Sequence, residues 1–239
     1  MKTLLRRVLG LNRNEEARIA WVKAELQALP SGSRLLDAGA GEQQFRKFCQ
    51  HLHYVSQDFG QYDGTGDQRG LQTGSWDYSG IDLVSDIVEI PAPDASFDAI
   101  LCTEVFEHVP DPLEALDEFR RLLKPGGILI LTAPFASLVH FAPYYFANGF
   151  SRYWYHHHLV RRGFTVVKLE PNGHWYAFLL QEVSRLPSML ARRSKLLSGV
   201  IAPVALLMLI VVRVSELLGR ASDTTDVAVL GYHCVARKA

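Results

Sequence analysis

The sequence predicts an α/β fold in which short strands alternate with helices around a mostly parallel sheet. Apolar runs of strand length lie at residues 34–37, 53–58, 81–84, 97–102 and 128–132, and helical patterns separate most of them. A helix between two strands lets the second strand run in the same direction as the first, so this alternation favours βαβ units. With 239 residues, the chain is long enough for one large domain with helices on both faces of its sheet.

Two helices are well marked. The first precedes the sheet, ends at Pro30-Ser31-Gly32, and has one apolar face made of Ile19, Val22, Leu26 and Leu29. The second spans 112–123 and is opened by Asp111-Pro112 and closed by Lys124–Gly127. Its apolar face is made of Leu113, Leu116, Phe119 and Leu123.

The second half of the chain continues the alternation. A helix at about 151–162 leads through Gly163 into a strand at Phe164–Leu169, and a last strand is predicted at Val227–Val235. We therefore predict four segments. Residues 1–30 form a basic arm and helix, 31–170 the core, 171–226 a helical apolar insertion, and 227–239 the last strand of the core sheet.

Within this insertion, Leu196–Val212 carries no charge and is flanked by Lys195 and Arg213. Its 17 residues sit at the lower limit for a membrane span, and a run of this length is more often a buried or interface helix. A single crossing would also separate the last strand from its sheet. A helix lying in the membrane plane, broken at Pro203, is the alternative, and it would give peripheral membrane contact through 196–212.

Composition restricts partners and compartment. The chain has 25 basic and 25 acidic residues, so we expect no general nucleic-acid binding. Cys49, Cys102 and Cys234 are odd in number and far apart, which favours a reducing compartment and hence the cytoplasm, with the membrane surface as the alternative site. Met1–Arg7 is basic, but its apolar run is too short for a signal peptide.

A glycine loop follows the first strand, in the sequence Asp37-Ala38-Gly39-Ala40-Gly41. Two glycines at this spacing allow a tight turn and a close approach of backbone amides to a ligand. A dinucleotide-binding loop has a third glycine where this chain has Gln44, which disfavours a dehydrogenase. The acidic Asp37 suits a cationic amino-acid group better than a diphosphate. The alternative is a glycine-rich turn with a structural role only.

Two further acids close the next strands. Asp58 lies 19 residues after Gly39, where an acid receives the ribose hydroxyls of an adenosine. Asp86 and the apolar Ile87 suit an adenine, whose amine would donate to the carboxylate while the aliphatic chain covers the ring. Either acid alone is more often a loop residue or a helix cap. Three acids at the ends of three successive strands favour a site for an adenosine joined to an amino acid.

These segments, with Pro91–Val109 and Arg121–Gly127, resemble the class I S-adenosylmethionine-dependent methyltransferases. The likeness covers roughly residues 30–135 and is to the broad group that includes quinone-biosynthesis O-methyltransferases. It implies a Rossmann-like, seven-stranded, mostly parallel sheet with an antiparallel last strand. It implies S-adenosylmethionine as cofactor, with Asp37, Gly39 and Gly41 around its methionine part, Asp58 at the ribose, Asp86 and Ile87 at the adenine, and Thr103 near the methionine chain. Gln43 departs from the family, which often has a third glycine there.

Two histidines are placed to assist methyl transfer. The methyl group of a sulfonium is already electrophilic, so a general base is needed only if the acceptor is a hydroxyl or a protonated amine. His108 lies just past the fourth strand and His140 follows the fifth, at the edge where such sheets bind ligands. We predict these two as catalytic residues.

The same region is a candidate site for a divalent metal ion. If a helix starts near Glu104, then Glu104, Glu107 and His108 share one face, and His140 could complete the site. Similar Glu-x-x-Glu-His segments bind metal in some quinone O-methyltransferases and in methyltransferases of small-RNA 3′ ends. The alternative is that the acids stabilise a helix N-terminus and His108 only packs.

The segment Pro134–His158 is dense in aromatic residues and is predicted to shape the acceptor pocket. Its members are Phe135, Phe141, Tyr144, Tyr145, Phe146, Phe150, Tyr153, Trp154 and Tyr155. The sequence thus predicts methylation of an apolar or aromatic small molecule, most simply at oxygen. Metal-assisted methylation of an RNA 3′ end and a non-catalytic S-adenosylmethionine-binding module are the alternatives. The acceptor and the oligomeric state stay open.

Overall fold

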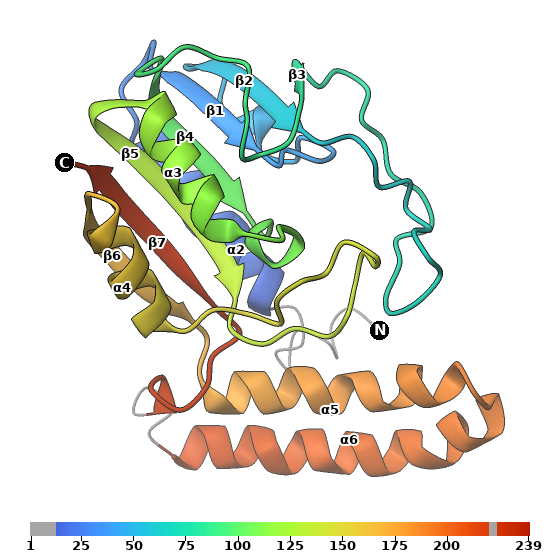
Figure 1. Ribbon diagram of the computed structural model, residues 1–239. Coiled ribbons are helices and arrows are strands. Elements are labelled where there is room, and N and C mark those ends of the chain that lie inside the picture. Colours follow the sequence, from blue (N-terminus) through green and yellow to red (C-terminus); the bar gives the residue numbers. More distant parts are fainter. Residues whose placement is uncertain (1–12, 220–223) are drawn as a thin grey trace. The chain divides into compact units, whose positions relative to one another are not determined.

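The computed structural model describes residues 13–219 and 224–239 (Figure 1). The predicted basic arm at Met1–Arg7 lies outside them. The chain forms two compact units. Of the described residues, the sheet unit contains Ile19–Glu170 and Gly231–Ala239, and the helical unit contains 13–18, 171–219 and 224–230.

A seven-stranded sheet has the order β3-β2-β1-β4-β5-β7-β6. Strands β1, β2, β4 and β5 and the short β3 pair in parallel, whereas β7 is antiparallel to β5. The strands are β1 (Arg34–Ala38), β2 (His53–Asp58), β3 (Leu83–Val84), β4 (Phe97–Thr103), β5 (Leu123–Pro134), β6 (Phe164–Asn172) and β7 (Gly231–Lys238). The predicted fold class, including the antiparallel last strand, is confirmed, although β7 begins at Gly231 rather than Val227.

Both faces of the sheet are buried, as the continuous apolar runs in the sequence predict. Helix α2 (Arg13–Gln27) contributes Val22 and Leu26 to a core cluster with Leu35 of β1 and Leu101 of β4. The alternate residues of these strands, such as the fully buried Ile100, point to the other face. Helix α3 (Pro112–Leu122) covers that face in Figure 1, with α4 (Arg152–Arg161) farther along it.

An α-helix does not separate every pair of successive strands. After the glycine loop the chain forms only the short 3-10 helix η1 (Arg46–Phe48), and residues 59–82 connect β2 to β3 without a helix. The glycine residues of the connection 59–82 explain why it contains no helix. Six glycines between positions 60 and 80 all adopt positive φ, a conformation that no right-handed helix contains. They are Gly60, Gly64, Gly66, Gly70, Gly74 and Gly80.

The helical unit contains an antiparallel pair, α5 (Trp175–Ala191) and α6 (Lys195–Leu218), which lie side by side in Figure 1. Leu180 and Val183 of α5 pack against Ala205 and Leu209 of α6. Helix α6 has 24 residues and runs through Pro203 without a break, unlike the interrupted helix that was one alternative for this stretch. By length and composition it could cross a membrane, and little of it is buried.

Candidate active site

The predicted site residues lie at one edge of the sheet, where the parallel strands end. Asp37 lies near the end of β1, Asp58 ends β2 and Thr103 ends β4, while His140 follows β5. This edge is where ligands bind in open α/β sheets. The fold thus gathers residues that are up to a hundred positions apart in sequence.

Asp58 holds the glycine loop to the end of β2. One of its carboxylate oxygens accepts from the amide of Gly41 at 2.9 Å, and the other accepts from the amide of Gly60 at 3.0 Å. Burial raises the pKa of this carboxyl, while the amide donors act in the opposite direction. Since a carboxylate has about four lone pairs, these two bonds leave capacity for hydroxyl donors.

Both glycines of the loop are needed where they stand. Gly39 has φ of 72° and Gly41 has φ of 51°, values that other residues rarely adopt. A Cβ atom on Gly39 would lie 2.5 Å from Cγ2 of Val105, and one on Gly41 would lie 2.8 Å from Cζ2 of Trp76. The loop is therefore covered closely by two side chains from elsewhere in the sheet unit.

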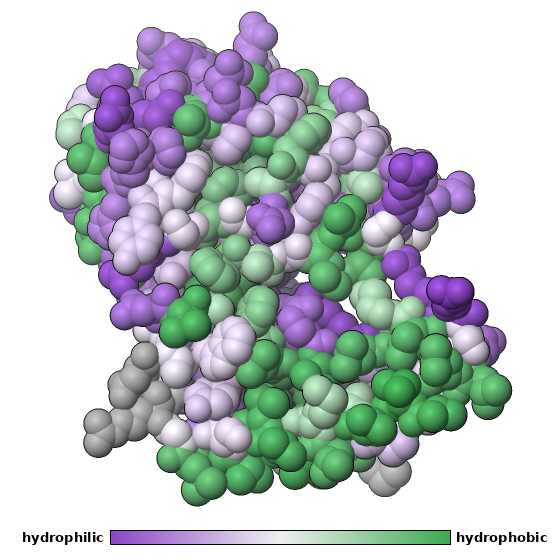
Figure 2. All heavy atoms as spheres, turned by 60° about the horizontal axis from the view of Figure 1, so that its bottom comes forward, coloured by the Kyte–Doolittle hydropathy of each residue, from purple (hydrophilic) through white to green (hydrophobic). Residues whose placement is uncertain are grey.

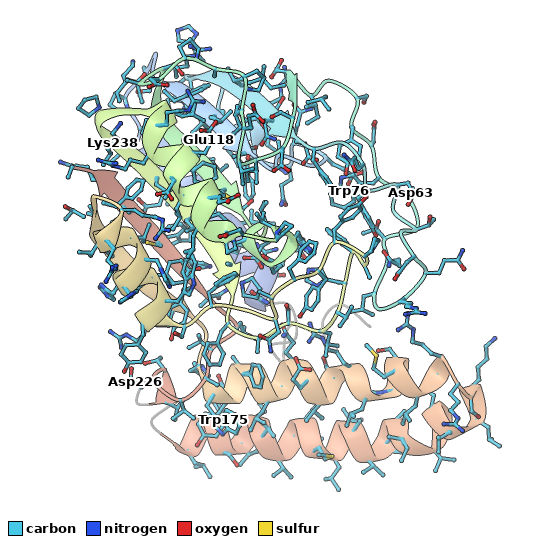
Figure 3. All side chains as sticks on the ribbon, in the orientation of Figure 1. Asp63, Trp76, Glu118, Trp175, Asp226 and Lys238 are labelled. Atoms are coloured by element: carbon cyan, nitrogen blue, oxygen red, sulfur yellow. The ribbon has the colours of Figure 1, made fainter. Side chains whose placement is uncertain are left out.

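The sequence did not mark either of these two side chains. Trp76 comes from the glycine-rich connection 59–82, where it is labelled in Figure 3. Its ring lies edge-on to Phe141 at 5.1 Å between centroids, and Tyr62 stacks on Phe141 at 4.6 Å. No periodic pattern marks a connection of this kind. Val105 belongs to the segment Pro91–Val109 that resembles the family, but its sequence pattern does not indicate contact with Gly39.

Asp37 is buried, with 2% of its surface exposed, and accepts a 2.6 Å hydrogen bond from the hydroxyl of Tyr54. Burial raises the pKa of Asp37 to about 7, with the Tyr54 hydrogen bond opposing that rise. A carboxyl in this state would gain from a cationic partner, because the partner would stabilise the charged form. An amino-acid ammonium fits that requirement.

The two residues predicted to bind an adenine differ in exposure. Ile87 is 7% exposed, whereas Asp86 is exposed and accepts from the amide of Val88 at 3.2 Å. The amide of Ser85 donates to the carbonyl oxygen of Asp58 at 3.1 Å, which ties this segment to the end of β2. Thr103 is half-buried and in register with Thr132 of β5.

Three of the four predicted metal ligands come together. One potential ligand atom each from Glu107, His108 and His140 lies within 4.8 Å of the others. Oε1 of Glu107 is 3.8 Å from Nε2 of His108 and 3.9 Å from Nε2 of His140. Ligands bound at about 2.1 Å with angles of 90–109° are roughly 3.0–3.4 Å apart, so a small contraction would suffice to hold a cation.

One ring nitrogen of each imidazole is hydrogen-bonded to a backbone carbonyl. Nδ1 of His108 is 2.6 Å from the carbonyl oxygen of Tyr144, and Nδ1 of His140 is 2.8 Å from that of Leu138. A carbonyl accepts only, so each Nδ1 carries a proton, and in the neutral ring of His108 the lone pair of Nε2 is then on the side of Glu107. Burial, and then the neighbouring His140, lowers the pKa of His108 to about 4.

Glu104 does not join this group. It leaves β4 with φ of 53°, and its carboxylate accepts from the hydroxyl of Thr132 at 2.9 Å. No α-helix starts there: the chain forms the short 3-10 helix η2 (Phe106–His108), and α3 begins at Pro112. The expected i, i+3, i+4 face is therefore wrong, because the Glu104 amide still bonds Thr132 of β5.

The aromatic segment divides between site and core. Phe141 stacks on His108 with 5.0 Å between ring centroids, and the Tyr145 ring lies 5.4 Å from His140. In contrast, Phe150 and Tyr155 are buried and Tyr153 is 77% exposed. Only the part of the segment before about residue 146 therefore reaches the His108–His140 pair.

These features are those expected of a site for an adenosine–amino-acid cofactor, and a carboxylate–imidazole cluster lies at the same edge of the sheet. A family model described as a methyltransferase domain matches residues 11–186. The chain belongs to the class I S-adenosylmethionine-dependent methyltransferases.

Known relatives fit this assignment. The ubiquinone biosynthesis O-methyltransferase of Xylella fastidiosa (strain 9a5c) is 38% identical over 107 residues, which are 43% of this chain and 42% of the relative. The demethylmenaquinone methyltransferase of Clavibacter sepedonicus is 30% identical over 130 residues, 52% of this chain and 49% of the relative. The matched part thus spans less than half the length of either relative.

A solved S-adenosylmethionine dependent methyltransferase from Mesorhizobium loti has the same fold. Its TM-score is 0.51 at 16% identity, over 90% of this chain and 96% of that one. At this identity the likeness concerns the fold alone.

Proposed function

We propose that the protein transfers a methyl group from S-adenosylmethionine to a hydroxyl oxygen of an apolar, aromatic small molecule. The observation that carries this proposal is the Glu107–His108–His140 cluster, which lies beside the rings of Phe141 and Tyr145. A hydroxyl needs to lose its proton as the oxygen is methylated, and neutral imidazoles suit that task. The two curated relatives carry quinone names, which supports a ring-shaped acceptor.

The cofactor would lie along the glycine loop. When bound, it supplies a methyl group that its sulfonium makes electrophilic. Asp37 would hold the ammonium group of the methionine part, and Asp58 the ribose hydroxyls. Asp86 and Ile87 would bind the adenine, and Thr103 would lie near the methionine chain. The tight cover of Gly39 by Val105 fits a loop whose backbone, rather than its side chains, meets the ligand.

The two histidines have alternative uses at the same place. Without a metal ion, the Nε2 atom of His108 or His140 would take the proton of the acceptor hydroxyl. With a divalent ion, Glu107 and both histidines would hold it, and Glu104 would need a new rotamer to join them. Such an ion would bind neighbouring hydroxyls of the acceptor and lower their pKa.

Methyl transfer tests this directly. Full-length protein is incubated with methyl-labelled S-adenosylmethionine and an alkylated catechol, and with the matching phenol that has one hydroxyl. We expect labelling of the catechol. A preference for the catechol over the phenol, loss of transfer with a chelator and recovery with magnesium or manganese would assign the cluster to a metal ion. If a chelator does not change methyl transfer, the reaction does not use a metal ion, and the histidines are left as the candidate bases.

A matched pair of variants separates the cluster from general damage. Glu107→Gln should lower catechol methylation by about 10-fold or more, because the cluster loses its carboxylate charge. Glu114→Gln, an exposed change on α3, should leave it unchanged. Equal activity of the two variants would remove the cluster from the reaction. Cofactor binding without transfer to any hydroxyl acceptor would instead favour a non-catalytic binding module.

We place the protein in the cytoplasmic compartment, in solution or at the membrane surface. Cys49, Cys102 and Cys234 are buried free thiols, which agrees with a reducing compartment. Fractionation of the native cells, followed by immunoblotting, tests this placement.

A further inference from the structure

Helix α6 exposes an apolar surface along most of its length. Its exposed apolar side chains include Leu196 (80% exposed), Leu207 (61%) and Leu218 (83%). Figure 2 shows the apolar residues of the helical unit as a broad continuous area. A 24-residue helix is about 36 Å long, so this surface exceeds the isolated apolar patches that are normal on monomers.

Among the described residues of its unit, α6 packs one stripe against α5. Ala205 and Leu209 pack against α5, and both are less than 9% exposed. The stripe at 204, 207 and 211 faces elsewhere, since these positions are 50%, 61% and 56% exposed. Helix α6 therefore packs one face against α5 and exposes a second apolar face. It also lies beyond residue 186, where the match to the methyltransferase family model ends.

The charges around this face are basic. From Pro171 to Gly219 the chain has five basic and two acidic residues, and the acids Glu182 and Glu216 are paired with Arg185 and Arg213. The turn between the helices carries Arg192, Arg193 and Lys195, all exposed. The helix dipoles do not account for all three cations: Arg192 and Arg193 follow the C-terminus of α5, where a cation is favourable, but Lys195 opposes the dipole of α6. Anionic lipid headgroups would match them.

We propose that α6 docks in the plane of a lipid bilayer, with its 204–207–211 face among the acyl chains and the basic turn among anionic headgroups. Spanning is disfavoured on two grounds. Strands β6 and β7 lie in the same sheet, so the chain leaves and returns on one side of the bilayer. A helical hairpin that spanned twice would carry three cations across the apolar interior of the bilayer, which is unfavourable for each of them.

Sedimentation with sucrose-loaded vesicles tests this contact on the full chain. We use vesicles of phosphatidylcholine alone and vesicles with 30% phosphatidylglycerol. We expect binding to both and much tighter binding to the anionic vesicles. The readout requires no methyl acceptor, so its result is independent of the proposed reaction.

The apolar contact is tested by a triple variant, Val204→Gln, Leu207→Gln and Val211→Gln. Its partition coefficient should fall by about 100-fold, because three apolar side chains no longer favour the acyl region. Val160→Gln with Val167→Gln is the matched control, since these residues are 59% and 50% exposed in the sheet unit. Circular dichroism and S-adenosylhomocysteine binding verify that each variant is folded. Unchanged partitioning of the folded triple variant would overturn the proposal.

The electrostatic part is tested by changing Arg192, Arg193 and Lys195 to Gln. At about 1 kcal/mol per cation, binding to anionic vesicles should weaken about 100-fold, while binding to phosphatidylcholine changes little. An equal loss on both vesicles would contradict the headgroup contact.

Orientation and competing partners are decided by two further measurements. A cysteine placed at the exposed Ala191 should react with a membrane-impermeant maleimide outside sealed vesicles, and complete protection would contradict an in-plane helix. Sedimentation equilibrium without lipid should give the same mass for wild type and triple variant. A dimer that the triple variant disperses, without vesicle binding of the wild type, would assign the face to a second copy of this chain.

Discussion

At the scale of single residues, the site depends on a buried carboxyl that folding makes costly to ionise. Asp37 has an ordinary pKa of 3.8, and burial raises it to about 7 in the folded chain. The sequence predicted Asp37 as a ligand because of its place before two glycines. It could not predict Tyr54, whose hydroxyl reaches Asp37 only because β1 and β2 are neighbours.

This carboxyl makes stability depend on pH. The folded chain binds the Asp37 proton more tightly than the unfolded chain, so the free energy of unfolding falls as pH rises from about 4 to about 7. Asp37→Asn should remove this part of the decline between pH 4 and pH 7, while it weakens S-adenosylmethionine binding by about 10-fold or more through loss of a charge-assisted contact. Melting curves and calorimetric titration measure the two effects. A variant with the slope and affinity of wild type would contradict this role.

Crowding at the glycine loop gives a second prediction at this scale. Gly39→Ala and Gly126→Ala impose the same positive φ, 72° and 74°, but nothing lies within 4 Å of the Gly126 position. Each should lose about 1 kcal/mol of stability from backbone strain. Only Gly39→Ala should lose a further 1–3 kcal/mol, roughly, from contact with Val105, and with it cofactor affinity. Equal melting temperatures and affinities of the two variants would show that the loop tolerates a side chain.

At the scale of elements, regular strands and helices were predictable and irregular connections were not. Apolar runs located β1, β2, β4 and β5, because strands buried on both faces leave a continuous signal. Helix α3 was predictable from its Asp111-Pro112 opening, which the Asp111 side chain caps. Connection 59–82 and helix η2 follow tertiary contacts, such as the parallel bridge between Leu71 and His140, which no local pattern contains.

That connection should matter for cofactor binding. Trp76 covers Gly41 and packs on Phe141, which itself stacks on His108. Trp76→Ala should weaken S-adenosylhomocysteine binding by about 10-fold, since one aromatic contact contributes on the order of 1 kcal/mol. Trp76→Phe should recover most of the affinity because it keeps an apolar ring against the loop. If both variants bind like wild type, connection 59–82 has no part in the cofactor site.

At the scale of the whole molecule, the chain joins a methyltransferase sheet unit to a helical pair with a different surface chemistry. The apolar stretch at 196–212 was visible in the sequence, but its continuation to a 24-residue helix was not, because Pro203 suggested an interruption. A proline lacks one amide donor and disturbs a helix, yet α6 continues on both sides of it. Sequence pattern therefore located this element but not its length or its partner face.

The measurement that tests the central claim most directly is calorimetric titration of the full chain with S-adenosylmethionine and S-adenosylhomocysteine. We predict saturable binding of each at one molecule per chain, competition between the two, and weaker binding by Gly39→Ala than by Gly126→Ala. Absence of binding by either compound to the folded chain, or equal affinity of the two glycine variants, would contradict a cofactor site on the Asp37–Gly41 loop.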